Sequence, residues 1–168
     1  QYFHLLRRHG RTAGRRPLVV MTPKSLLKKR ESASPVARLC EGRFEPVLAD
    51  ERGPGARLPR RVLLCSGKVY YDLAAFRAEN KIDDVALLRI EQLYPFPRRS
   101  LLANVERLVA GGAGLVWVQD GAKNMGAWSY VHQRLSGLGL AASYAGRAAA
   151  ASPATGSMTT HLAEQDHI

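Results

Sequence analysis

The stretch Arg61-Val-Leu-Leu-Cys-Ser-Gly-Lys-Val-Tyr-Tyr-Asp72 decides the fold. Its apolar run over residues 62–65 is too short for a helix, and a helical pattern follows at once. It therefore predicts a strand, a tight turn at Ser66-Gly67 and a helix over about 68–80. The turn carries a hydroxyl, a glycine and a lysine, which suit an anion held at a helix N-terminus. Many such turns use small residues for geometry alone, so the signal gains weight only from similar junctions elsewhere.

The chain downstream of this stretch repeats the alternation of strand and helix. Residues 85–90 form a nearly continuous apolar run, and Tyr94-Pro95-Phe96-Pro97 is a rigid linker. Core spacing predicts a helix over 97–110, which Gly111-Gly112 ends. The remaining segments predict a strand over 115–118, a helix over 127–135, a strand over 141–144 and a helix over 160–165.

The chain upstream of the stretch is less regular. Residues 1–9 predict a helix and residues 18–21 a short strand. Thr22 as N-cap with Pro23 as first helical residue then predicts a helix start. Residues 31–59 are polar and rich in proline and glycine, so we expect a loop-rich segment with at most a short edge strand at 44–48.

These elements predict an α/β fold of three layers, with a mostly parallel sheet and helices on both faces. Strands that are apolar on both faces and alternate with amphipathic helices are typical of such sheets. The 168 residues, 46% of them hydrophobic, suffice for one core, so we expect a single domain over 1–168. Because the chain begins at Gln1 in a helical pattern, we expect it to be a piece of a longer protein or a processed product.

The formal net charge of +11 suggests acidic partners, although a soluble basic surface explains it equally well. Nucleic-acid binding is the weakest interpretation, because aromatic residues do not alternate with the basic ones. No run approaches the length of a membrane span. Cys40 and Cys65 give no disulfide framework or metal spacing, and the five histidines show no ligand spacing.

Three expected helix starts carry cations close to the end of an expected strand. They are Lys24, Lys68 and the pair Arg98-Arg99. Because the carboxyl ends of parallel strands meet along one edge, and ligands bind beyond that edge, these cations predict a pocket for a phosphate-bearing ligand. The alternative is that they decorate exposed loops and the turns serve geometry alone.

The turn after residues 115–118 offers Asp120 and Asn124, which could act on a ligand or serve as ordinary turn residues. Trp128 is expected to pack at an interface, and Arg147 lies in a small-residue segment suited to a neighbouring subunit. Glu91 is expected to be an ion-pair partner of a nearby arginine. No nucleophile with its base and no paired acids appear, so we predict no catalytic and no metal-ligating residue.

Six ordered motifs resemble the C-terminal domain of the decarboxylating component of 2-oxoglutarate dehydrogenase. They cover nearly the whole chain: Gln1-Tyr-Phe-His-Leu-Leu-Arg-Arg8, Met21-Thr-Pro-Lys-Ser-Leu-Leu27, Cys65-Ser-Gly-Lys-Val-Tyr-Tyr-Asp72, Arg89-Ile-Glu-Gln-Leu-Tyr-Pro-Phe-Pro97, Asn124-Met-Gly-Ala-Trp128 and Ala151-Ser-Pro-Ala-Thr-Gly156. The motifs do not distinguish this family from its close relative, the dehydrogenase of 2-oxoadipate.

The resemblance implies a fold like the transketolase C-terminal domain, and an oxidoreductase of the tricarboxylic acid cycle that uses thiamine diphosphate and Mg²⁺. In that family both cofactors bind other domains, so none is expected in this chain. The implied partners are those remaining domains, a second copy in a homodimer, and the complex with dihydrolipoyl succinyltransferase. The implied location is the cytoplasm of a bacterium or the mitochondrial matrix of a eukaryote.

Some actinobacterial members of the family bind acetyl-CoA as an activator on this domain. By similarity, the residues implied at that site are Arg8, Lys24, Gln92, Arg98 and Arg99, and the local pattern adds Ser66 and Lys68. Acetyl-CoA and AMP are the expected ligands. The residues implied at the interface are Asn124, Trp128 and Arg147.

The sequence departs from the family at two places. Asp120-Gly-Ala-Lys123 replaces an acidic pair and a proline, and residues 31–59 are divergent. The leading expectation is a structural, dimerising and regulatory domain that is inactive alone. The alternative is a stand-alone module that binds an anion or a nucleotide.

Overall fold

The computed structural model describes residues 1–14, 16–50 and 57–165. The chain divides into two compact units, Gln1–Pro46 and Val47–Ile168, and each is described by itself. The prediction of a single domain stays a prediction. None of the helices in the described ranges combines the length and the hydropathy that a membrane-spanning helix needs.

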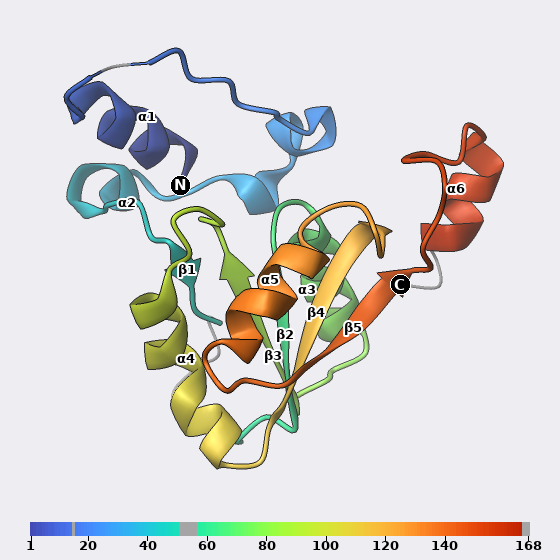
Figure 1. Ribbon diagram of the computed structural model, residues 1–168. Helices are drawn as coiled ribbons and strands as arrows, with labels where there is room; N and C mark the ends of the chain where they lie inside the picture. The colour runs from blue at the N-terminus through green and yellow to red at the C-terminus, as the bar shows by residue number, and fades with distance from the viewer. Residues whose placement is uncertain (15, 51–56, 166–168) are drawn as a thin grey trace. The chain divides into compact units, whose positions relative to one another are not determined.

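The second unit contains a five-stranded sheet with the strand order β1-β3-β2-β4-β5 (Figure 1). Strand β2 pairs in parallel with both β3 and β4, β4 pairs in parallel with β5, and β1 runs antiparallel to β3. The strands are β1 (Val47–Leu48), β2 (Arg61–Cys65), β3 (Val85–Ile90), β4 (Gly114–Ala122) and β5 (Ala142–Arg147). This topology confirms the mostly parallel sheet, and β1 confirms the short edge strand.

Helices cover both faces of this sheet. They are α3 (Val69–Glu79), α4 (Arg98–Ala110) and α5 (Trp128–Ser136), and α6 (Met158–Gln165) follows near the end of the chain. Their bounds agree with the expected helices to within a few residues. Figure 1 shows α5 in front of the sheet and α3 behind it.

The apolar core lies on both sides of the sheet because side chains alternate along each strand. The larger cluster joins Val62 and Leu64 of β2 and Trp117 of β4 to Leu101 of α4 and Val131 of α5. The smaller cluster lies on the α3 side and contains Cys65, Val69 and Val118. The three expected layers are therefore confirmed.

Glycine is required in the turn from β2 to α3. Gly67 has a φ of +78°, a conformation that residues with a Cβ rarely adopt. This lets the chain reverse direction within Ser66-Gly67-Lys68, so α3 begins at Val69 directly after the strand. The strand, turn and helix expected from this stretch are confirmed.

The first unit contains α1 (Tyr2–Arg11), α2 (Val36–Glu41) and two 3₁₀ helices, η1 (Lys24–Lys28) and η2 (Arg30–Ser32). The expected strand over 18–21 was wrong. These residues pair with no strand among the described residues, and Val19 is 79% exposed. An apolar run forms a strand only where a partner supplies hydrogen bonds, and the sequence pattern does not report the partner.

Two further expectations in this unit need correction. Thr22 is not an N-cap, because its hydroxyl donates back to the carbonyl of Val20, and the helix that follows is a 3₁₀ helix with Pro23 at its cap. The loop-rich segment over 31–59 also contains α2, which the sequence analysis missed. Pro35 fits just before this helix because proline lacks the N–H that a first turn leaves unpaired.

Candidate functional site

The carboxyl ends of β2, β3 and β4 lie side by side at one edge of the sheet. The parallel register aligns Cys65 with Arg89, and Leu64 with Trp117. Ser66 and Lys68 therefore leave the end of the central strand, between the segments that follow β3 and β4. Ligands of open α/β sheets bind beyond this edge, so it is the candidate site.

Lys68 and Asp120 form an ion pair across this edge. Lys68 Nζ lies 2.7 Å from Asp120 Oδ2, and the two side chains are 38% and 35% exposed. Lys68 comes from the turn after β2 and Asp120 from the last residues of β4. The structure thus brings a predicted anion-binding cation together with a carboxylate that the sequence analysis treated separately.

A second ion pair lies at the end of β3. Arg89 Nη1 is 3.8 Å from Glu91 Oε1, and both side chains are about one-fifth exposed, at 22% and 20%. The guanidinium of Arg89 also lies over the ring of Tyr70, 4.1 Å from its centroid, where a cation is attracted to the π face. The expectation that Glu91 is an ion-pair partner is confirmed.

The residues after β3 continue the edge toward α4. Gln92 Nε2 donates a 2.8 Å hydrogen bond to the carbonyl of Pro95, so this side chain shapes the linker before the helix. Arg98 and Arg99 are the first two residues of α4, and both are exposed. Among the described residues, neither guanidinium forms an ion pair or a hydrogen bond.

Arg98 lines a pocket of about 280 Å³ at the start of α4. Its other polar walls are Tyr94, Tyr130, Gln133 and Arg134. The guanidinium of Arg134 lies over the Tyr130 ring, 4.9 Å from its centroid. The sequence analysis missed Gln133 and Arg134, because their spacing on α5 marks only an exposed helix face.

Arg8 and Lys24, the other two predicted anion-binding residues, belong to the first unit. The guanidinium of Arg8 lies 3.9 Å from the centroid of the Phe44 ring, and Lys24 is an exposed residue at the start of η1. Lys24 does not follow a strand, so the strand-end argument for this residue was wrong. Its place in the site, like that of Arg8, stays a prediction.

Gln119 organises the turn from β4 to α5, and the sequence analysis missed it. The side chain is buried, and its Oε1 accepts hydrogen bonds from Trp117 Nε1 and from the backbone N–H of Trp128. Its Nε2 donates to the carbonyls of Ala122 and Met125 at 2.8 and 2.9 Å. One amide therefore fixes the backbone beside Asp120. A polar residue at a strand end gives no periodic signal that could have revealed this.

The three predicted interface residues make contacts within this unit. Asn124 Nδ2 donates to the Ala150 carbonyl, and its Oδ1 accepts from the Ala150 N–H. Trp128 packs against the ring of Tyr144, with 5.4 Å between the ring centroids. Their role at an interface with another subunit stays a prediction.

Arg147, the third of these residues, attaches α6 to the end of β5. Its guanidinium donates to His161 Nδ1 at 2.8 Å and to Gln165 Oε1 at 3.1 Å, and lies 3.3 Å from Glu164 Oε2. The side chain is 13% exposed. It therefore holds the last described helix to the sheet.

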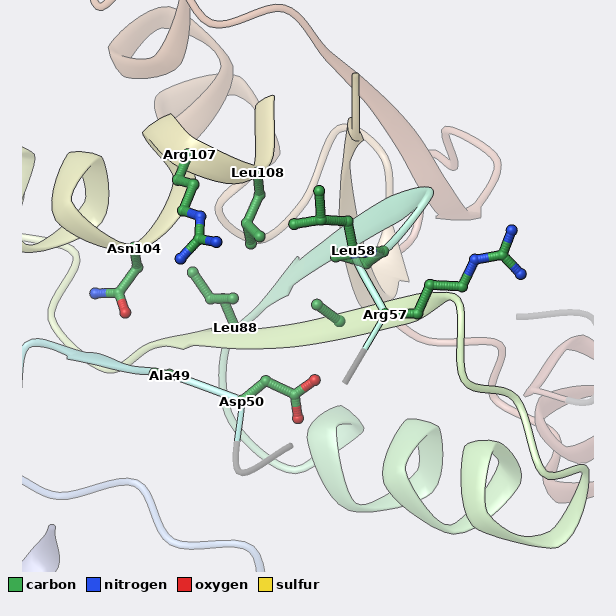
Figure 2. A pocket seen from close by; sticks show the side chains of 10 residues that line it. Ala49, Asp50, Arg57, Leu58, Leu88, Asn104, Arg107 and Leu108 are labelled. Atoms are coloured by element: carbon green, nitrogen blue, oxygen red, sulfur yellow. The ribbon is translucent and has the colours of Figure 1, made fainter. Parts of the chain in front are cut away.

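A larger cavity of about 410 Å³ lies away from the predicted anion site, beside β3 and α4. Figure 2 shows Asn104, Arg107 and Leu108 extending from α4 on one side of it, while Arg57 points away from the other labelled side chains. Among the described residues that line it, the one carboxylate is that of Asp50, which forms a two-pronged ion pair with Arg77 at 2.6 and 2.9 Å. None of the predicted anion-binding residues lines this cavity.

Cys65 is a buried small apolar residue, as expected. Burial raises the pKa of its thiol to about 12, against an opposing effect of the Arg89 charge. Such a thiol is not a nucleophile at neutral pH, because the thiolate is the reactive form. Within the described residues, no three His, Cys, Asp or Glu side chains are placed to hold a metal ion.

Comparison with known proteins places these features in a family. The family model described as "2-oxoglutarate dehydrogenase C-terminal" matches residues 33–168. The 2-oxoglutarate dehydrogenase E1 component of Cupriavidus necator is 44% identical over 168 residues, which cover 98% of this chain. The protein of the same name from Brucella ovis is 46% identical in an alignment 187 residues long, which covers 97% of this chain. The chain spans 18% of the length of each of these relatives.

Proposed function

Because the chain belongs to the 2-oxoglutarate dehydrogenase C-terminal family, we propose that it is the C-terminal structural and dimerising domain of such an enzyme. The observation that carries the proposal is that two relatives match 97–98% of this chain, while the match covers only 18% of each relative's length. The alternative of a stand-alone binding module has no support in these comparisons. Outside this chain, the partners are the remaining domains of the enzyme, a second copy and the succinyltransferase of the complex.

The enzyme would decarboxylate 2-oxoglutarate and pass a succinyl group to a lipoyl arm, in the cytoplasm of a bacterium or the matrix of a mitochondrion. Thiamine diphosphate and Mg²⁺ supply the decarboxylation chemistry when bound. In the family that the motifs of this chain resemble, both cofactors bind domains outside this one. We therefore assign the cofactors to the other domains and no catalytic step to this chain.

The test of this assignment is the activity of the 168-residue chain beside that of the complete enzyme that carries it. Both are supplied with 2-oxoglutarate, thiamine diphosphate, Mg²⁺ and an artificial electron acceptor. The complete enzyme is expected to turn over, and the isolated chain is not. Turnover by the isolated chain would overturn the proposal. Parallel assays with 2-oxoadipate decide between the two substrates by the ratio of their kcat/KM values.

The exposed cations at the edge of the sheet support a regulatory anion site in the same domain. Lys68, Gln92 and Arg98 follow adjacent parallel strands or begin the helix after them, and Arg98 lines a pocket with Arg134. Guanidinium groups bind phosphates through paired N–H donors, so a nucleotide such as acetyl-CoA or AMP fits this chemistry. Ser66 and Arg99 complete the proposed set in this unit, and Arg8 and Lys24 of the first unit remain residues that the family resemblance implies.

Calorimetry with acetyl-CoA and with AMP tests the site. We compare the parent with Lys24→Ala and Arg99→Ala, and use Arg107→Ala as the control, because Arg107 is an exposed arginine further along α4. The first two substitutions are expected to weaken binding and the control to leave it unchanged. Identical heats in all four proteins, or no heat in the parent, would exclude the site.

The predicted interface residues are tested by the association state. Sedimentation of the complete enzyme should give a dimer, and Trp128→Ala should shift it toward monomer at micromolar concentration, because an aromatic side chain at an interface often contributes most to binding. His132→Ala, which removes a neighbouring exposed ring on α5, is the matched control. A Trp128→Ala enzyme that stays dimeric while correctly folded would remove this residue from the interface.

A further inference from the structure

Lys68, one residue of the proposed anion site, already has an anion beside it. Its ammonium lies 2.7 Å from the carboxylate of Asp120, which comes from the next strand in the sheet. Three donors point out from an ammonium group, but its charge is compact and one carboxylate compensates much of it. A ligand phosphate must therefore compete with Asp120 for Lys68.

The ion pair between Lys68 and Asp120 can separate at little cost. Both side chains are more than one-third exposed, at 38% and 35%, and ion pairs with that access to water are weak. The backbone on the Asp120 side is nevertheless firmly placed, because Gln119 fixes the turn through buried hydrogen bonds. The carboxylate can thus swing away from Lys68 without any change in the sheet.

The other cations of this edge divide into two kinds. Arg89 resembles Lys68 in having a carboxylate neighbour, Glu91, at 3.8 Å. Arg98 and Arg99 are exposed and have no carboxylate partner among the described residues. An incoming anion can therefore be attracted first by the arginines of α4, and only then reach the ammonium held by Asp120.

We propose that Asp120 is a built-in competitor at the anion site, which a phosphate-bearing ligand displaces from Lys68. This inference rests on the proposed regulatory site. A phosphate monoester carries close to two negative charges near neutral pH, whereas a carboxylate carries one. Asp120 therefore raises the concentration that any anion needs to reach Lys68, and a phosphate monoester overcomes this cost more readily because its larger charge is attracted more strongly to the cations of this edge.

The experiment measures acetyl-CoA and AMP binding by calorimetry at low and at physiological salt. Asp120→Asn removes the charge and keeps the size of the side chain. Glu106→Gln is the control, because it removes one exposed carboxylate from α4 and gives the same change in net charge. Lys68→Met, alone and together with Asp120→Asn, completes a double-mutant cycle. Circular dichroism confirms that each variant is folded.

Asp120→Asn is expected to raise the affinity about two- to fivefold, in line with the strength of a half-exposed ion pair. Glu106→Gln should change it by less, and in the Lys68→Met background the Asp120→Asn substitution should give no more gain than the control. Inorganic phosphate and acetate, each titrated alone, should both bind the Asp120→Asn variant more tightly than the parent, with phosphate the tighter of the two in both proteins.

The possible failures are distinct. If neither the parent nor Asp120→Asn binds acetyl-CoA or AMP, the regulatory site itself is excluded. If the parent binds and Asp120→Asn binds equally or more weakly, Asp120 is not a competitor and the inference is overturned. A gain of the same size in the Lys68→Met background would also overturn it, because the effect would then be general repulsion.

Discussion

The indole N–H of Trp117 donates a 2.9 Å hydrogen bond to Oε1 of Gln119, two residues further along the same strand. Residues two apart lie on the same face of a strand, so the apolar face that Trp117 fills continues directly into a polar group. Both side chains are buried. The end of β4 is therefore fixed by a core residue on one side and by the turn to α5 on the other.

Replacing Gln119 with leucine should destabilise the protein by about 2–4 kcal/mol, because it leaves buried donors and acceptors without partners. The donors are the Trp117 indole and the backbone N–H of Trp128, and the acceptors include the carbonyls of Ala122 and Met125. Urea unfolding followed by fluorescence measures the change. Gln133→Leu, on the exposed face of α5, should stay within about 0.5 kcal/mol of the parent. Equal effects at the two positions would mean that the buried network does not stabilise the turn.

The ion pair of Arg77 and Asp50 should contribute far more to stability than the exposed pair of Arg60 and Asp84. The Asp50 side chain is 7% exposed, and it also accepts the backbone N–H of Leu87. Arg77→Met removes the two-pronged ion pair from this buried carboxylate and should cost about 3–5 kcal/mol. Arg60→Met makes the same chemical change at a side chain that is 72% exposed, and should cost less than about 1 kcal/mol. Urea unfolding measures both changes. Free energies of unfolding of the two variants that differ by less than about 1 kcal/mol would contradict this ranking.

Burial of Cys65 should make stability depend on pH at high pH. The pKa of the thiol is 9.0 in the unfolded chain, and burial raises it to about 12 in the folded protein. Between these values the folded state keeps the proton and the unfolded state releases it, so the free energy of unfolding falls as the pH rises. Below pH 9 both states hold the proton and the effect is absent. The measurement is the difference between the parent and Cys65→Ala in urea unfolding at pH 8, 9.5 and 10.5. A difference that does not change with pH would show that the thiol is accessible to water in the folded state.

Arg147→Met should release α6 while leaving the sheet intact. The substitution removes the bonds to His161 and Gln165 and the ion pair with Glu164. Hydrogen bonds of a charged group contribute about 1.5–3 kcal/mol each, so opening of the helix should become more than about tenfold more frequent. Hydrogen exchange of residues 158–165 reports it, and residues 115–118 of β4 serve as the internal reference. Arg134→Met, on the exposed side of α5, should leave exchange in both segments unchanged.

The sequence predicted the sheet well because its central strands carry their own signal. Residues 62–65 and 85–90 are short apolar runs, and a strand buried on both faces needs little else to be recognised. Residues 18–21 have the same pattern but pair with no described strand. A partner that is distant in the sequence decides between the two outcomes, and a local pattern contains no information on it.

The candidate site was predicted only in part, for a related reason. The position of Lys68 followed from the turn after β2, but its pairing with Asp120 depends on β4 lying next to β2 in the sheet. The strand order is not the chain order, so residues 52 positions apart meet. Gln119 and Arg147 act through hydrogen bonds to groups that the fold brings together, and a single polar residue does not reveal them.

Strand β1 is only two residues long, and it covers the outer side of β3 at Ile90 and Arg89. A strand edge this short offers another polypeptide very few N–H and carbonyl groups to pair with, so the sheet resists extension by aggregation on that flank. Pairing with a neighbouring chain is thereby disfavoured at β1, whereas β5, with six residues, forms the other edge of the sheet.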